Sequence, residues 1–196
     1  MTRLPGDYLD ASSRRIEIAL WHARHLDPLL ADPQADIIAL QAYFEGLFTT
    51  GDTAVELAAN GLTTPFRQPS PHISDAILAL RREQDQRVVE LGQALAQWQR
   101  QAAVPNGGHD PVNVLEEAAH IRNTVIHQFY DKRQGVPPEW IYGVEHSQRP
   151  GVIRAGRIDF LAHAFAQSLG ALGALLVTFP DELRNQRFEF QGDVAV

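Results

Sequence analysis

The chain has 196 residues, of which 44% are hydrophobic and 21% are charged, so its length and composition are those of one soluble globular domain. It contains no cysteine, which excludes disulfides, thiolate catalysis and cysteine-ligated zinc. The net charge of −7 argues against a protein that coats duplex DNA, but it does not exclude a small basic cleft that acts on RNA.

Apolar residues in the N-terminal third recur with the period of an amphipathic helix. A first helix is predicted from the pair Ser12-Ser13 to about Leu30, because serine is a favoured N-cap. A second helix is predicted to begin near Pro33, since proline suits a first helical turn, and to run to residues 60–61 with a bend at residues 49–51.

The middle of the chain is predicted to hold a loop and two further helices. Residues 62–72 contain three prolines and no apolar rhythm, which indicates a linker loop. Ser74 is expected to cap one long helix that ends at residues 105–108. Asp110 followed by proline then starts a helix that is predicted to run to about Tyr130 or Lys132.

A last helix is predicted from Arg157 to Phe179. Its apolar stretch is interrupted by polar residues, and a helix that spans a membrane needs about 20 predominantly apolar residues, so we expect a core helix. The N-terminus lacks the apolar core of a signal peptide. The chain is therefore predicted to be cytoplasmic, with no membrane partner.

Together these elements predict an all-α fold, an up-and-down bundle of four to five helices that forms a single domain over residues 1–196. An irregular insert is expected at about 133–153, and a weakly patterned tail after about 184. Because long irregular segments are uncommon inside compact domains, the insert is a candidate functional segment.

The helix that begins at Asp110 carries the residues on which a functional hypothesis depends. Arg122 falls in the middle of its apolar arc, where a guanidinium must be paired or must face a polar cleft. Asn123 and His127 are four residues apart and are therefore neighbours on the flank of the same helix.

The segment Arg122-Asn123-Thr124-Val125-Ile126-His127 resembles the Arg-x4-6-His motif of HEPN-domain proteins. The resemblance implies a bundle of four or five helices. It also implies a metal-independent endoribonuclease, a toxin or defence effector whose active site is shared between the two chains of a homodimer. RNA is then the substrate, an antitoxin protein is a candidate partner, and no cofactor or metal is expected.

The resemblance also implies a role for each residue. Arg122 would contact the scissile phosphate and Asn123 would assist positioning. His127 would be the general acid or base for attack by the ribose 2′-hydroxyl. Arginine offers a fixed fork matched to phosphate oxygens, and histidine exchanges a proton near neutral pH without a metal. Just after the motif, the predicted substrate-binding residues are Tyr130, Lys132 and Arg133.

The spacing of the motif is not specific by itself. It occurs three more times, in the pairs Arg15 and His22, Arg67 and His72, and Arg157 and His163. The adjacent asparagine, the position on a helix and the apolar surroundings distinguish Arg122. On an ideal helix Arg122 and His127 point about 140° apart, so the reach of arginine, a helix distortion or a second chain must bring them together. Some family toxins carry tyrosine two residues after the histidine, where this chain has Phe129.

Two other functions stay open. The first is a non-catalytic bundle that binds a nucleotide or a partner protein, in which Arg122 pairs with a buried carboxylate such as Glu45 and sets the register of the helices. The second is a bundle metallohydrolase built on four helical histidines, although the spacing His-x-x-x-His is absent and no residue is predicted as a metal ligand: His22, His25, His120 and His127.

Overall fold

The computed structural model describes residues 3–32, 34–103, 114–127, 130–133, 141–144 and 155–188. Within these ranges the side chains of residues 37, 103, 120, 123–127, 130–133, 141–144 and 155–158 lie outside the description. The described helices confirm the all-α prediction. They are α1 (Pro5–Ala31), α2 (Ile37–Thr63), α3 (Ile73–Leu80), α4 (Gln86–Ala103), α5 (Val114–His127) and α6 (Ala155–Val177), followed by a short 3-10 turn at Asp181–Leu183.

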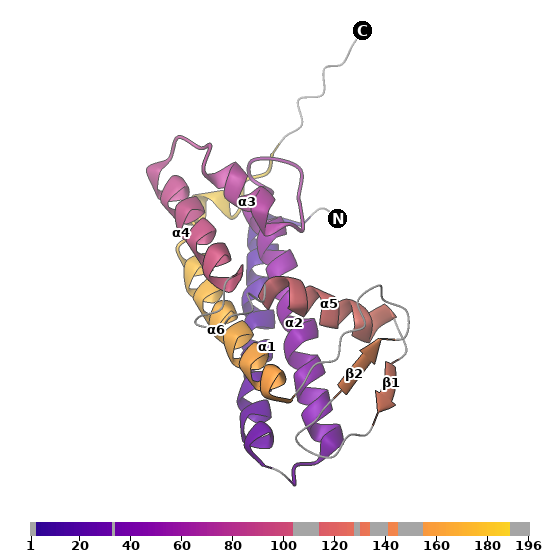
Figure 1. Cartoon of the computed structure of the whole chain (residues 1–196). Helices are drawn as coiled ribbons and strands as arrows, with labels where there is room; N and C mark the ends of the chain where they lie inside the picture. The colour runs from indigo at the N-terminus through magenta and orange to yellow at the C-terminus, as the bar shows by residue number, and fades with distance from the viewer. Residues whose placement is uncertain are drawn as a thin grey trace.

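The long helices α1, α2, α4 and α6 run lengthwise along the bundle, and α5 crosses over α2 (Figure 1). The core between them is aromatic and aliphatic. Phe48 of α2 stacks on Phe165 of α6, with ring centroids 5.1 Å apart and planes 3° apart. Both side chains are fully buried. Burial of this kind is the main favourable contribution to the stability of such a bundle.

Helix α1 begins at Pro5, seven residues before the serine pair that was predicted to start it. Proline is placed at the first turn, and the carboxylate of Asp7 accepts a hydrogen bond of 2.8 Å from the backbone N–H of Leu4. The prediction that Ser12 caps the helix was wrong, because Ser12 lies inside α1 and its side chain contacts α2. Its buried hydroxyl donates a hydrogen bond of 2.8 Å to the carbonyl of Ala54 on α2.

Helix α2 is continuous through residues 49–51, where a bend was predicted. Asp36 caps it by accepting a 2.9 Å hydrogen bond from the N–H of Ile38. Gly51 allows a close approach of α6, since a Cβ at that position would clash with the rings and methyls of Phe165 and Leu169. The glycine therefore reflects packing and not a break in the helix.

The long helix expected from Ser74 is two helices, which raises the number of described α helices to six. Helix α3 ends at Leu80, and Asp85 begins α4 by accepting a 2.9 Å hydrogen bond from the N–H of Arg87. The turn between them brings α4 against the end of α3. An added Cβ at Gly92 would lie 2.9 Å from the Cβ of Leu80.

A two-stranded antiparallel sheet follows α5, where the sequence predicted no strand. Strand β1 (Tyr130–Arg133) pairs with β2 (Ile141–Val144), with Tyr130 opposite Val144 and Arg133 opposite Ile141. Helix α5 therefore ends at His127 and does not continue to Tyr130 or Lys132. The start of that helix at Asp110 and most of the insert at 133–153 lie outside the described residues.

Helix α6 contains a window, Asp159–Val177, that is long and apolar enough to cross a membrane by composition alone. Its apolar side lies in the core, where Leu161, Phe165 and Leu169 are fully buried. Of this window 33% is buried, so one such helix is weak evidence for a membrane span and is compatible with a soluble protein. The first residues of the weakly patterned tail dock on the bundle, because Arg184 contacts Asp10 at 3.3 Å and the N–H of Phe188 donates to the carbonyl of Thr64.

Candidate functional site

Arg122 projects from α5 toward α2 and lies between two carboxylates. Its Nε is 3.6 Å from Oδ2 of Asp52, and its Nη1 is 3.6 Å from Oε1 of Glu56. The side chain of Arg122 remains 25% exposed. A carboxylate on the second helix, such as Glu45, was predicted as the partner of Arg122. The observed pairs lie further along the same helix, while Glu45 accepts a 2.7 Å hydrogen bond from Gln41.

The carboxyl group of Asp52 is the most perturbed acid of this site. Its side chain is 13% exposed, and burial raises its pKa from 3.8 to about 6. The negative charge of Glu56, one helical turn away, raises the pKa further, and the positive charge of Arg122 lowers it. A carboxyl group with a pKa near neutrality can both accept and release a proton at physiological pH.

These residues line a cavity of about 620 Å³ between α2, α5, the end of α4 and the loop before α3. The volume is that of an ordinary small-ligand site. Its charged and polar lining residues are Asp52, Glu56, His72, Ser74, Gln99, Arg100, Glu116 and Arg122. Three carboxylates and two guanidinium groups therefore face one space, and protonation of Asp52 makes that space less negative.

The other predicted catalytic residues lie on the same helix. Asn123 follows Arg122, and His127 is the last residue of α5, but their side chains lie outside the described ones. The predicted substrate-binding residues Tyr130, Lys132 and Arg133 form strand β1, and their side chains are likewise outside the description. The structure thus brings Arg122 together with α2 and does not report on its distance from His127.

Asp52, Glu56 and Arg100 were not among the site residues predicted from the sequence. Asp52 and Glu56 are four residues apart, so they lie on one face of α2, and this spacing was visible in the sequence. Arg100 lies in the last turn of α4. What the spacing could not reveal is that α5 crosses α2 at this position.

Two of the four histidines of the metallohydrolase hypothesis, His22 and His25, have described side chains, and both pack among aromatic residues of α1 and α2. His22 and His25 belong to an aromatic cluster in which the ring of His25 stacks on Tyr43 at 5.3 Å and lies 4.1 Å from Trp21. His22 packs on Gly46 of α2, and its pKa is lowered by burial and by the neighbouring His25. The side chains of His120 and His127 lie outside the described ones.

The fold and the site define a helical bundle with a polar cavity between its crossing helices. Comparison with protein families, with curated proteins and with solved structures finds no match to this chain.

Proposed function

We propose that the chain is a HEPN-like, metal-independent endoribonuclease and that the cavity beside Arg122 is its phosphate-binding site. The observation that carries the proposal is the position of Arg122, on the helix of the Arg-Asn-x-x-x-His motif, at the wall of a polar cavity and with its side chain 25% exposed. An arginine that served packing alone would not need a cavity beside it.

The contacts of Arg122 with α2 fit this role. Its Nε and Nη1 lie 3.6 Å from carboxylate oxygens of Asp52 and Glu56, which is longer than a direct hydrogen bond. The side chain lines the cavity and is 25% exposed, so a ligand in the cavity can reach it. The planar fork of N–H groups on a guanidinium matches two oxygens of a tetrahedral phosphate group, so phosphate competes well for such an arginine. Arg100, on another wall of the cavity, supplies a second positive charge.

The proposed reaction needs no cofactor because RNA carries its own nucleophile. A base takes the proton of the ribose 2′-hydroxyl, whose oxygen attacks the adjacent phosphorus. The bond from phosphorus to the 5′ oxygen breaks, and an acid returns a proton to that oxygen. The products are a 2′,3′-cyclic phosphate and a 5′-hydroxyl end. Arg122 neutralises the phosphate as charge develops on it.

Two proton carriers are required, and the chain offers two candidates. His127 is the one that the motif implies, with Asn123 assisting the position of the phosphate. Asp52 is the second, because its pKa of about 6 lets it hold or release a proton near neutral pH. In the full proposal the enzyme acts in the cytoplasm as a homodimer, is held in check by an antitoxin protein, and binds RNA through Tyr130, Lys132 and Arg133.

The test is RNA cleavage by the purified protein in the presence of EDTA, with the ends of the products analysed. We expect cyclic phosphate ends, and we expect His127→Ala and Arg122→Ala to lower the rate by at least a hundredfold. Arg82→Ala, which changes an exposed arginine that does not line the cavity, is the matched control and should cleave normally. Unchanged cleavage by His127→Ala would refute the mechanism.

The second candidate function is a non-catalytic bundle that binds a nucleotide or a partner protein. The observation that favours it is the pairing of Arg122 with two carboxylates of α2, which is what an arginine that sets helix register would show. It predicts that no RNA is cleaved and that Arg122→Ala acts on thermal stability alone. Nucleotide binding, measured by calorimetry, then becomes the functional assay.

A further inference from the structure

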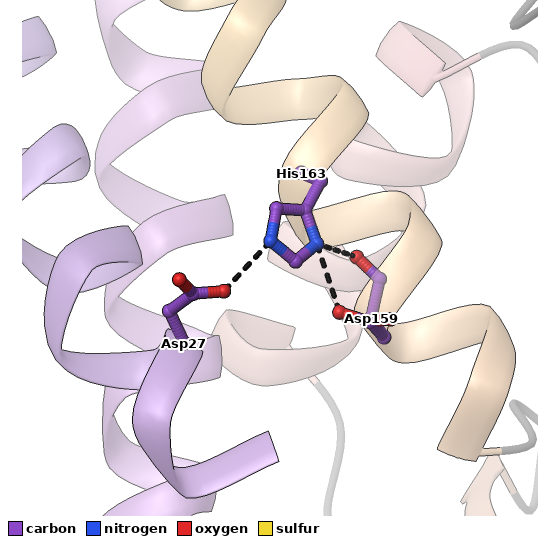
Figure 2. A group of neighbouring side chains, drawn as sticks. All are labelled: Asp27, Asp159 and His163. Atoms are coloured by element: carbon purple, nitrogen blue, oxygen red, sulfur yellow. Dashed lines mark hydrogen bonds and ion pairs between the residues drawn. The ribbon is translucent and has the colours of Figure 1, made fainter. Parts of the chain in front are cut away.

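A second group of ionisable side chains lies away from the Arg122 cavity, between α1 and α6. Figure 2 shows His163 of α6 between two aspartates, Asp27 of α1 and Asp159 one turn earlier on α6. Its Nε2 is 2.7 Å from Oδ1 of Asp27, and its Nδ1 is 2.8 Å from Oδ1 of Asp159. One ligand atom from each of the three residues lies within 4.8 Å of the others.

The helices explain why these three side chains meet. Asp159 and His163 are four residues apart and therefore share one face of α6. Asp27 lies in the last turns of α1, which packs along α6. Each of the three side chains is more than half exposed, so a hydrated ion can reach them from solvent.

Two cavities adjoin the group, and His163 lines both of them. The first, of about 420 Å³, lies between α1 and α6, and its walls include Leu20, Ala23 and Ala162. The second, of about 610 Å³, lies between α4 and α6 and includes Gln101 and Gln167. An ion held by His163 would therefore face open space in which water or a small ligand can complete its coordination.

We propose that Asp27, Asp159 and His163 bind a divalent transition-metal ion of the zinc type. Imidazole nitrogen and carboxylate oxygen are ligands that Zn²⁺ accepts, whereas Ca²⁺ and Mg²⁺ prefer oxygen alone. Three protein ligands with a fourth, open position are the pattern of reactive zinc sites. The ligand that such an ion would take is a small anion or a carbonyl oxygen that enters from either cavity.

The contacts in Figure 2 are those of the metal-free group. The two aspartates contact opposite nitrogens of the ring, and Nδ1 also lies 2.9 Å from the backbone carbonyl oxygen of Asp159. One ion binds one ring nitrogen, so metal binding requires the ring and the Asp159 carboxylate to turn toward a common point. The side chains can turn because all three are exposed at the surface of the bundle. The competing account is that His163 merely links α1 to α6 as a charged bridge between two aspartates.

The site is independent of the proposed ribonuclease activity, which needs no metal. The test is a calorimetric titration of the metal-free, full-length protein with Zn²⁺, together with the visible absorption of the Co²⁺ form. We expect one ion bound per chain, a rise in the thermal midpoint with Zn²⁺ and none with Mg²⁺. The Co²⁺ spectrum should report nitrogen and oxygen ligands in a low coordination number.

Three variants address the ligands one at a time: Asp27→Asn, Asp159→Asn and His163→Gln. Each should weaken Zn²⁺ binding at least tenfold and should remain folded, because the side chains are exposed. The controls are two residues of the same helix α1: Asp10→Asn, an exposed aspartate paired with an arginine, and His25→Gln, an exposed histidine. Zn²⁺ binding that is absent, or that survives His163→Gln, overturns the proposal and leaves the charged bridge.

Discussion

The Nε of Arg122 lies 3.6 Å from Oδ2 of Asp52, and this contact joins the crossing helix α5 to α2. The two residues differ in how their charge depends on pH. A guanidinium group is a permanent cation in proteins. By contrast, burial and the negative charge of Glu56 raise the pKa of Asp52 to about 6. The arginine therefore meets a partner whose charge depends on pH, in a cavity that solvent reaches.

Replacing Asp52 with asparagine tests the raised pKa. Because the pKa of Asp52 is 3.8 in its ordinary environment and about 6 in the folded chain, its contribution to stability is complete below about pH 4 and is lost as the pH rises through 6. Asp52→Asn should therefore stabilise the protein by about 1 to 2 kcal/mol at pH 8 and by little at pH 4.5. Urea unfolding at the two pH values measures the difference.

The control for this prediction is Asp10→Asn, which changes an aspartate that is 65% exposed and paired with Arg184. It should show no comparable gain at pH 8. If Asp52→Asn lowers stability at pH 8, the attraction of Arg122 outweighs burial, and the pKa of Asp52 is not raised.

Replacements of Arg122 separate charge from shape. Arg122→Ala leaves Asp52 and Glu56 facing each other without their cation, so we expect a loss of about 1 to 3 kcal/mol in the free energy of unfolding. Arg122→Lys keeps the charge and should lose less stability. Under the ribonuclease proposal it should still lose most of the cleavage rate, because an ammonium cannot form the fork that binds phosphate.

A double-variant cycle shows whether the pair is coupled. The combination Arg122→Ala with Asp52→Asn removes both charges, so Asp52→Asn should stabilise the Arg122→Ala variant by more than it stabilises the unaltered protein. Strictly additive effects of the two changes would mean that the contact at 3.6 Å contributes nothing. Parallel stability and activity measurements on Arg122→Lys then distinguish an arginine that binds substrate from one that only sets the register.

Two glycines form a matched pair for the packing of α2 on α6. An alanine at Gly51 would push its Cβ into Phe165 and Leu169, so Gly51→Ala should lower stability by about 1 to 3 kcal/mol. Gly170 of α6 has no atom within 4 Å of such a Cβ, and alanine is the better helix former. Gly170→Ala should therefore raise stability by about 0.5 to 1 kcal/mol. Thermal unfolding of the two variants gives shifts of opposite sign, and equal shifts would contradict the packing at Gly51.

Local sequence signals predicted the helices well and their ends poorly. The apolar period of residues 157–179 corresponds to α6, which runs from Ala155 to Val177. The start predicted at Ser12 was wrong because its hydroxyl serves a contact with Ala54, which is distant in sequence. The break between α3 and α4 follows from the cap at Asp85 and the close packing at Gly92. The apolar repeat of the sequence continues unchanged through the break between α3 and α4, so it predicted one helix where there are two.

From the sequence by itself come the all-α class, the lack of cysteine chemistry, the resemblance around Arg122 and the requirement that this arginine find a polar partner. These depend on composition and on neighbours within a few turns of one helix. Only the tertiary structure decided that the partners are Asp52 and Glu56 and that Asp27 meets His163. The reason is physical. Helical periodicity is a local property, whereas the place where two helices cross depends on the packing of the whole core.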